Sequence, residues 1–355
     1  MSHDVTAPSV FDGGGLSASH VAMHEPEASQ VLADLYGIAG ELSRLDAEKD
    51  DSFRVVVDGR NHSVLKVSNP HDPADELDFQ LELLTRVARI DPSIPVPGVI
   101  PSRDGALATY IQDAAGQQRR VWLIEFLPGA TLDTFRTTPQ QREQVGEVLA
   151  KLRHATAGYS HPFDSRAIAW DVQHIMALEP LLEFVENAQH HAALAQGLAR
   201  LGDLQPRIRA LRTQVLHNDF SKSNLLGDVT REDFVTGVID FGDAVRTAVA
   251  IDVSTALLNQ LPRDAAENPV DDLFADGRDI VRGYLRRADL TDEELALIPH
   301  LTMARVVARA LITTRRAQLF PHNVRYIMRN TEQGWAQLDW FLARTVDQIS
   351  ATFAH

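Results

Sequence analysis

Two short motifs in the second half of the chain restrict its fold and chemistry more than any other feature. Residues 215–226 read VLHNDFSKSNLL, which contains the pattern H-x-D-x-x-x-x-N from His217 to Asn224. Composition alone predicts about 0.03 matches to that pattern in a chain of this length. Beyond Asn224, the next apolar run ends in Asp-Phe-Gly at 240–242. In this order, the two motifs predict a polar catalytic loop and a carboxylate carried on facing strands.

The spacing of these polar residues matches the needs of phosphoryl transfer. That reaction requires a carboxylate to accept the proton of the attacking hydroxyl, and metal ions to bridge the phosphates. We therefore predict that Asp219 is the base and that Asn224 and Asp240 bind Mg²⁺, which takes a few hard oxygen ligands when a nucleotide supplies others. His217 is predicted to fix the loop by a hydrogen bond rather than to do chemistry. The alternative is that Asp219 and Asp240 are turn or cap residues and that Asn224 caps the hairpin.

A lysine lies inside an apolar strand in the first half of the chain. Lys66 stands in the run VLKV, where burial of a lysine is costly unless its ammonium group is paired. In a kinase, such a lysine contacts the nucleotide phosphates and pairs with an acid on the following helix. We predict this role for Lys66, with Asp78 as its partner and Glu82 as the alternative. A solvent-exposed lysine on an edge strand is the competing interpretation.

The hydrophobic pattern divides the chain into parts of different character. We predict a flexible tail over 1–25, a β-rich nucleotide-binding lobe over 26–127 and a larger, mainly helical catalytic and substrate-binding lobe over 128–355. The fold class is therefore α+β.

Individual elements follow from the same pattern. In the first lobe, strands are expected at 53–57, 63–67, 106–111 and 120–126, with an Asp58-Gly59 hairpin turn between the first two, and helices at 28–39 and 75–88. In the second lobe, helices are expected to begin at Thr138 and Thr291 and to cover 177–201 and 301–317. A single β-hairpin is expected at 215–241, so both motifs lie on it.

Composition excludes several functional classes. The chain carries 34 Lys and Arg against 49 Asp and Glu, a net charge of −15, which opposes binding to nucleic acid. The absence of cysteine excludes disulfides, thiolate metal sites and thiol nucleophiles. No apolar run approaches the roughly 18 residues of a membrane span, and the first residues lack a secretory pattern. We therefore predict a cytoplasmic protein with no nucleic-acid or membrane partner.

Five segments together resemble the aminoglycoside phosphotransferase and choline kinase-like superfamily, which has the protein-kinase-like fold. They are the phosphate-covering loop at 48–53, the lysine strand at 64–70, the hinge at 122–129, the Trp-Asp pair at 170–171 and the run IDFGD at 239–243. Within the superfamily, the closest resemblance is to the hydroxylysine kinase branch. The chain departs from the pattern just before the predicted base, where Asn replaces the usual Gly. It contains neither a protein-kinase glycine loop nor a P-loop.

The resemblance implies a nucleotide site between the lobes. Lys66 would contact the α- and β-phosphates of ATP or GTP, and Ser52 would lie in the phosphate-covering loop. The backbone of Glu125, Phe126 and Leu127 would bind the purine edge, with the Phe126 ring in the core. The base and the Mg²⁺ ligands take the same roles in the resemblance as the spacing predicts.

The acceptor implied by the resemblance is a small amino alcohol or hydroxy-amino acid. An acidic pocket suits a cationic amine, so Asp243 and Asp171 are candidate acceptor contacts, and Trp170 could stack on the ammonium group. Arg305 could bind a carboxylate. A structural role competes with each of these assignments for Asp243, Asp171 and Trp170, and a solvated helix face competes for Arg305.

Together these observations predict a Mg²⁺-dependent small-molecule kinase that transfers the γ-phosphoryl group of ATP or GTP to a hydroxyl. One alternative is an aminoglycoside or other antibiotic phosphotransferase. Another is a nucleotide-binding pseudokinase that regulates a partner. The intact set of Asp219, Asn224, Asp240 and Lys66 argues against the pseudokinase.

Overall fold

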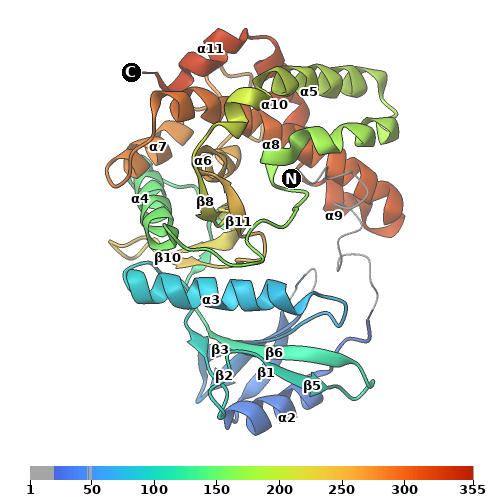
Figure 1. Ribbon diagram of the computed structural model, residues 1–355, viewed down its shortest axis with the longest axis vertical. Helices are drawn as coiled ribbons and strands as arrows, with labels where there is room; N and C mark the ends of the chain where they lie inside the picture. The colour runs from blue at the N-terminus through green and yellow to red at the C-terminus, as the bar shows by residue number, and fades with distance from the viewer. Residues whose placement is uncertain (1–19, 46, 48–49, 355) are drawn as a thin grey trace.

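The chain folds into a small β-rich lobe and a larger helical lobe, stacked along the long axis of the molecule (Figure 1). The structure is a computed structural model that describes residues 20–45, 47 and 50–354. The predicted α+β architecture with two lobes is confirmed.

The small lobe is built on a six-stranded antiparallel sheet. Its strands are β1 (Glu41–Leu45), β2 (Asp51–Val57), β3 (Arg60–Val67), β4 (Val99–Ile100), β5 (Thr109–Gln112) and β6 (Gln118–Glu125). They lie in the order β1-β2-β3-β6-β4, and β5 also pairs with β6. The predicted turn joins β2 to β3, where Asp58 and Gly59 have φ values of 50° and 73°, as a two-residue hairpin turn requires.

The two faces of this sheet have different partners. Helix α2 (Glu25–Tyr36) packs through Leu32 on one face, against buried residues such as Phe53 and Leu65. Because side chains alternate along a strand, Lys66 points to the opposite face. Its direct cross-strand partners are a serine on β2 and a tryptophan on β6, so these three side chains form one row.

Helix α3 (Ala74–Ile90) lies between that second face and the large lobe (Figure 1). Leu77 and Leu81 pack on Trp122 of the sheet. Phe79 and Leu83, in contrast, belong to the hydrophobic core of the large lobe. Both lobes therefore share α3, although it falls within the predicted first lobe.

The large lobe is mainly helical. Its α-helices are α4 (Pro139–Thr156), α5 (Ala188–Arg209), α6 (Val249–Leu258), α7 (Gly277–Leu285), α8 (Asp292–Leu319), α9 (Val324–Met328), α10 (Glu332–Leu342) and α11 (Val346–Ser350). The predicted helix starts at Thr138 and Thr291 are confirmed, and each residue forms a capping box. The single helix predicted at 177–201 is wrong. A 3-10 helix, η2 (Val172–Phe184), ends before Asn187 caps α5.

The strands of the large lobe form two small sheets rather than the single predicted hairpin. They are β7 (Ala130–Thr131), β8 (Thr213–Leu216), β9 (Leu225–Gly227), β10 (Val235–Val238) and β11 (Val245–Ala248). β8 pairs with β11, and β9 lies between β10 and β7. The loop from β8 to β9 and the loop from β10 to β11 therefore both cross between the same two sheets, which brings the two motifs together.

One helix of the described residues, α8, is long and apolar enough to cross a membrane by length and composition. It is also largely buried inside the large lobe, where residues such as Val307 and Leu311 are fully covered. A core helix meets the same criteria, so α8 is the central support of this lobe.

The predicted tail extends too far along the chain. Residues 1–19 lie outside the described part, but 20–24 are fastened to the sheet. The Met23 N–H donates to Asp51 Oδ2 at 2.9 Å, and Val21 exchanges two hydrogen bonds with the Gln117 side chain. Met23 is also buried. This segment escaped prediction because its partners are distant in the sequence.

Buried His300 on α8 gives the fold a testable dependence on pH. Burial, with Arg200 and Arg207 nearby, lowers its pKa to about 4. In the unfolded chain this histidine has a pKa of about 6.5, so between pH 6.5 and 4 it binds a proton that the folded protein does not bind. The free energy of unfolding therefore falls as the pH drops from 6.5 to 4. Between pH 7 and 5 this costs about 2 kcal/mol. His300→Gln should remove that part of the pH dependence in urea unfolding. An unchanged difference between the two pH values would contradict the assignment.

Candidate active site

The loop that follows β8 carries the first motif in a tightly turned conformation. Asn218 has a φ of 60°, a left-handed conformation that Asn adopts more readily than most residues. Its backbone N–H donates to Asp252 Oδ1 at 2.8 Å. Asn therefore satisfies here the backbone requirement that Gly meets in the family pattern. Asp252 lies inside α6, which is capped by Ala248, and its carboxylate anchors this loop.

His217 links the two motifs. Its Nε2–H donates to the Ile239 carbonyl at 3.1 Å, which leaves Nδ1 to accept the Asp219 N–H at 3.3 Å. Burial lowers the pKa of His217 and so favours this neutral form. The contacts match the predicted scaffold role.

The predicted base and the first predicted metal ligand are in direct contact. Asn224 Nδ2 donates to the Asp219 carbonyl at 3.1 Å and to Asp219 Oδ2 at 2.6 Å. Because the amide nitrogen is committed to Asp219, the amide oxygen of Asn224 is the atom available to a cation. The five-residue spacing thus closes the loop on itself.

Asp240 lies two residues beyond the end of β10, after Ile239. It has a φ of 63°, and its Oδ1 accepts the Gly242 N–H at 3.2 Å. Its side chain is exposed. No group of three or more acidic or histidine side chains in the described part of the chain could hold a metal ion by itself. One carboxylate and one amide oxygen suit Mg²⁺ that is also bound by nucleotide phosphates.

The carboxylates of the site shift one another's ionisation. Withdrawal from water raises the pKa of Asp219 to about 6, and the Asp240 charge adds to this, while Arg305 opposes it. Withdrawal from water also raises the pKa of Asp243 to about 7, with further contributions from Asp219 and Asp240. Such raised values are typical of functional sites where acids gather.

Arg305 of α8 supports this cluster from behind. It is only 4% exposed, so the alternative of a solvated helix face is wrong. Its guanidinium group donates to both the backbone carbonyl and the side-chain oxygen of Asn218. It also interacts electrostatically with four carboxylates, those of Asp219, Asp171, Asp243 and Asp252. These contacts occupy Arg305 in the loop rather than leave it for an acceptor carboxylate.

The Trp170-Asp171 pair is built into the fold. Asp171 is buried and caps η2 by accepting the Gln173 N–H at 3.0 Å, and it accepts the Thr247 hydroxyl at 2.8 Å. Trp170 is half-buried and packs against the large-lobe core. The contacts of both residues favour the structural alternative over an acceptor contact.

One acidic partner of Lys66 lies in the loop that precedes β2. Its Nζ lies 3.3 Å from Asp50 Oδ2 and 5.2 Å from the Trp122 ring centre. The predicted partner, Asp78, pairs with Arg120 at 2.5 Å. The alternative, Glu82 of α3, accepts a hydrogen bond from a tyrosine of the large lobe at 3.3 Å. Asp78 and Glu82 thus have other partners, and the expected pairing of Lys66 with Asp78 is wrong.

The remaining residues predicted for the nucleotide site lie along the sheet and at its end. Ser52 is buried in strand β2 opposite Lys66, not in a loop. Glu125 ends β6, and its carboxylate accepts the Gly98 N–H at 3.1 Å. The Phe126 N–H donates to His62 O at 3.1 Å, and the Phe126 and Leu127 side chains are half-buried.

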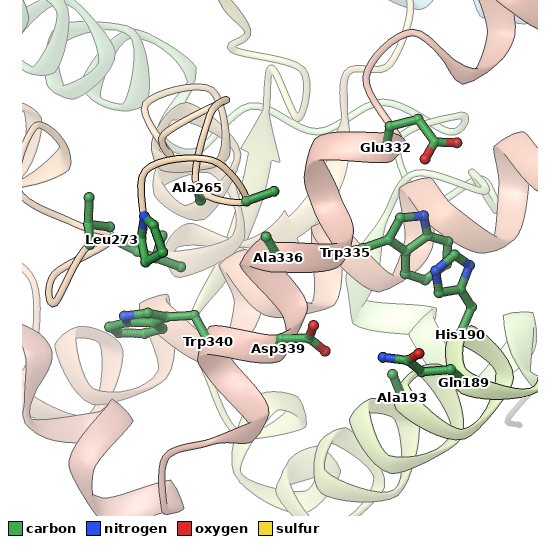
Figure 2. A pocket seen from close by; sticks show the side chains of 13 residues that line it. Gln189, His190, Ala193, Ala265, Leu273, Glu332, Trp335, Ala336, Asp339 and Trp340 are labelled. Atoms are coloured by element: carbon green, nitrogen blue, oxygen red, sulfur yellow. The ribbon is translucent and has the colours of Figure 1, made fainter.

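A separate cavity of about 530 Å³ lies between α5, α10 and the segment 265–273 (Figure 2). Its walls include Trp335 stacked on His190, Trp340, and two acids, Glu332 and Asp339. Both tryptophans are only partly covered. None of the motif residues lines this cavity.

The sheet of the small lobe carries a lysine, and two acidic loops meet in the large lobe. This is the arrangement of the protein-kinase-like phosphotransferases. The loops here lack the glycine-rich signature of the protein kinases themselves. The chain belongs to the phosphotransferase enzyme family (APH), which it matches over residues 41–290. It is therefore a phosphotransferase with an alcohol group as acceptor, as the sequence predicted.

Individual relatives agree with the predicted branch. The chain is 20% identical to hydroxylysine kinase of Bos taurus over 340 residues, which cover 88% of each chain. It is 21% identical to hydroxylysine kinase of Danio rerio over 332 residues, or 90% of this chain and 92% of the relative. Among solved structures, a microcompartment-associated aminopropanol kinase matches with a TM-score of 0.70 and 20% identity, over 90% of this chain and 97% of that one.

Proposed function

We propose that this phosphotransferase is a Mg²⁺-dependent kinase that moves the γ-phosphoryl group of ATP or GTP to the hydroxyl of a small amine. The observation that supports this proposal is the hydrogen bond from Asn224 to Asp219, whose carboxylate also interacts with the charge of Asp240. The proposed base and the two proposed Mg²⁺ ligands therefore lie close together. Mg²⁺ held by Asn224 and Asp240 would neutralise charge that develops on the phosphates.

The chain's own residues then divide the work. Asp219 orients the acceptor hydroxyl and takes its proton, and its raised pKa makes it a better proton acceptor than an ordinary aspartate. Lys66 contacts the α- and β-phosphates from the sheet, with Ser52 on the same face of the sheet. The backbone at 125–127 binds the purine edge.

The charge of the site favours an amine as acceptor. Asp219, Asp240 and Asp243 repel one another, and the buried Arg305 cancels only part of this charge. An ammonium group beside Asp243 would relieve the repulsion that raises the pKa of that carboxyl. Asp243 is therefore the acceptor contact that we retain. The hydroxylysine and aminopropanol kinases among the similar proteins are named for such hydroxylated amines.

The test is nucleotide turnover with Mg²⁺ and either ATP or GTP, across hydroxylysine, 1-amino-2-propanol, homoserine, choline and aminoglycosides. The pair 1-amino-2-propanol and 1,2-propanediol isolates the ammonium group. Acceptor-stimulated release of ADP or GDP by amines but not by the diol supports the proposal. Equal turnover of the diol, or no Mg²⁺-dependent nucleotide binding, would contradict it.

An antibiotic kinase is the second candidate, because an amicoumacin kinase matches the fold with a TM-score of 0.63 and 17% identity, over 90% of this chain and 91% of that one. Aminoglycosides in the panel distinguish it from a kinase of small amines. The predicted cytoplasmic location and the absence of nucleic-acid and membrane partners remain proposals.

The role of Lys66 gives a direct prediction. Lys66→Met should raise the KM for nucleotide at least about tenfold, because the phosphates lose a charged partner at close range. Asp78→Asn should change this KM less than twofold, since Asp78 pairs with Arg120 at the sheet surface. Steady-state kinetics at saturating acceptor measures both values. A large effect of Asp78→Asn would instead show that α3 supplies the lysine's partner once nucleotide binds.

A further inference from the structure

Arg166 lies between α4 and η2, beside the turn that carries Asp240. Its guanidinium group donates to the carbonyl oxygens of Gly242 and, at 2.6 Å, Ala244. Asp243 lies between these two acceptors and interacts electrostatically with Arg166. One planar group thus bridges both sides of the turn that follows Asp240.

The guanidinium group is itself firmly placed. It lies 5.3 Å from the ring centre of Phe79 on α3 and 5.5 Å from that of Phe163. Phe79 is fully buried in the large-lobe core. The segment that carries Arg166 is fastened to β11, since Asp164 Oδ2 accepts two hydrogen bonds from the Arg246 side chain, at 2.6 and 3.1 Å. The Arg166 guanidinium group and the backbone that carries it are therefore both held by ordered elements of the fold.

The turn needs such support. In the described part of the chain, the single hydrogen bond of the Asp240 carboxylate is to the Gly242 N–H. The Asp240 side chain is exposed and its backbone has a positive φ, so neighbouring side chains do not enclose it. The position of the Asp240 oxygens thus depends on where Gly242 is held.

We propose that Arg166 is a positioning residue that sets the metal-binding geometry of Asp240 through the carbonyls of Gly242 and Ala244. This inference rests on the proposed role of Asp240 as a Mg²⁺ ligand. A guanidinium group makes two divergent hydrogen bonds while stacked on rings, whereas an ammonium group cannot reproduce that geometry. Arg166→Lys therefore keeps the charge and removes the positioning.

The chain offers a closely matched control in Arg86 of α3. Arg86 also donates to two backbone carbonyls, those of Ala155 and Ala157, and it also lies over an aromatic ring, 5.5 Å from the centre of Tyr159. It does not touch the turn after Asp240. Arg86→Lys therefore loses the same kind of contacts, hydrogen bonds to two carbonyls and packing on an aromatic ring, without disturbing that turn.

The experiment measures binding of a non-hydrolysable ATP analogue by calorimetry over a range of Mg²⁺ concentrations, with thermal unfolding recorded beside it. We expect Arg166→Lys to need at least about fivefold more Mg²⁺ for half-maximal binding, while Arg86→Lys stays within twofold of wild type. If Arg166→Lys does not fold, Phe163→Leu, which removes one supporting ring, should still raise the requirement about threefold.

Two outcomes of the variants overturn the proposal. An unchanged Mg²⁺ requirement in folded Arg166→Lys would show that the arginine only stabilises the fold. An equal shift in Arg86→Lys would show that any loosening of α3 has this effect. Failure of the wild type to bind the analogue with Mg²⁺ would overturn the proposed function, and with it this inference, before any variant is compared.

Discussion

Asp219→Asn should lower kcat by a factor of about 10³ or more while leaving nucleotide affinity within about threefold of wild type. The amide can still occupy the space next to Asn224, but it cannot accept the acceptor's proton. Steady-state kinetics and calorimetry with a non-hydrolysable nucleotide measure the two effects separately. Retention of more than a tenth of the wild-type kcat would remove Asp219 from the role of base.

A matched control for this variant is Asp228→Asn. Asp228 also accepts hydrogen bonds within a turn, at 2.9 and 2.6 Å from the Thr230 N–H and hydroxyl. It lies outside the site, between β9 and β10. Its kcat and KM values should match those of the wild type, so a large loss in Asp219→Asn alone is chemical rather than structural.

The raised pKa of Asp219 also fixes the sign of the pH dependence. As the proposed base, Asp219 would act in its carboxylate form, and with a pKa of about 6 this form is lost as the pH falls through 6, well above the ordinary aspartate range. The value of kcat/KM for nucleotide, which reports the free enzyme, should therefore fall about tenfold per unit below pH 6. Asp219→Asn should lack this limb.

Asp240→Asn should abolish the dependence of nucleotide binding on Mg²⁺. An amide oxygen in place of the carboxylate leaves two neutral protein ligands, which bind Mg²⁺ poorly. We expect the affinity for an ATP analogue with Mg²⁺ to fall at least about tenfold, to the value that wild type shows in EDTA. Calorimetry with and without the metal gives both values.

Asp228→Asn serves again as the control and should keep the wild-type response to Mg²⁺. Metal-dependent binding that survives in Asp240→Asn would mean that another side chain holds the ion. Asp243, whose pKa is raised by burial and by the nearby charges of Asp219 and Asp240, would be the first to examine.

Local patterns predicted the features that depend on neighbouring residues. The Asp-Gly turn between β2 and β3 needs only two residues of the right backbone preference, and the helix starts at Thr138 and Thr291 depend only on residues within one turn of each threonine. The loop from His217 to Asn224 closes through contacts within eight positions, so its motif was readable from the sequence.

Features that depend on distant pairs were missed. Arg305 is hydrogen-bonded to Asn218, which lies 87 positions away in the sequence, and Asp252 is hydrogen-bonded to Asn218 from 34 positions away. Helix α8 is buried nearly all round, so a periodic pattern could not separate a buried arginine from a solvated one. The one feature of the sequence that indicated a role for Asp252 was its position as the single acid inside the apolar helix 249–258.

The partner of Lys66 was missed for a related reason. Acids occur on α3 at several helical positions, and helical periodicity alone does not decide which of them meets the sheet. The acid that lies 3.3 Å from Lys66 is Asp50, in the loop before β2, whereas Asp78 of α3 pairs with Arg120.

The shared helix α3 has a mechanical consequence. The chain passes between the sheet and the rest of the molecule three times, at 68–73, 91–98 and 126–129. The second passage is bonded to β10, where the Val238 N–H donates to Pro95 O at 2.7 Å, and the third is bonded through Thr236 to Pro128 O at 2.6 Å. Bodies joined at one point rotate about any axis, but separate tethers remove rotational freedoms. The sheet can therefore swing against the large lobe in few directions.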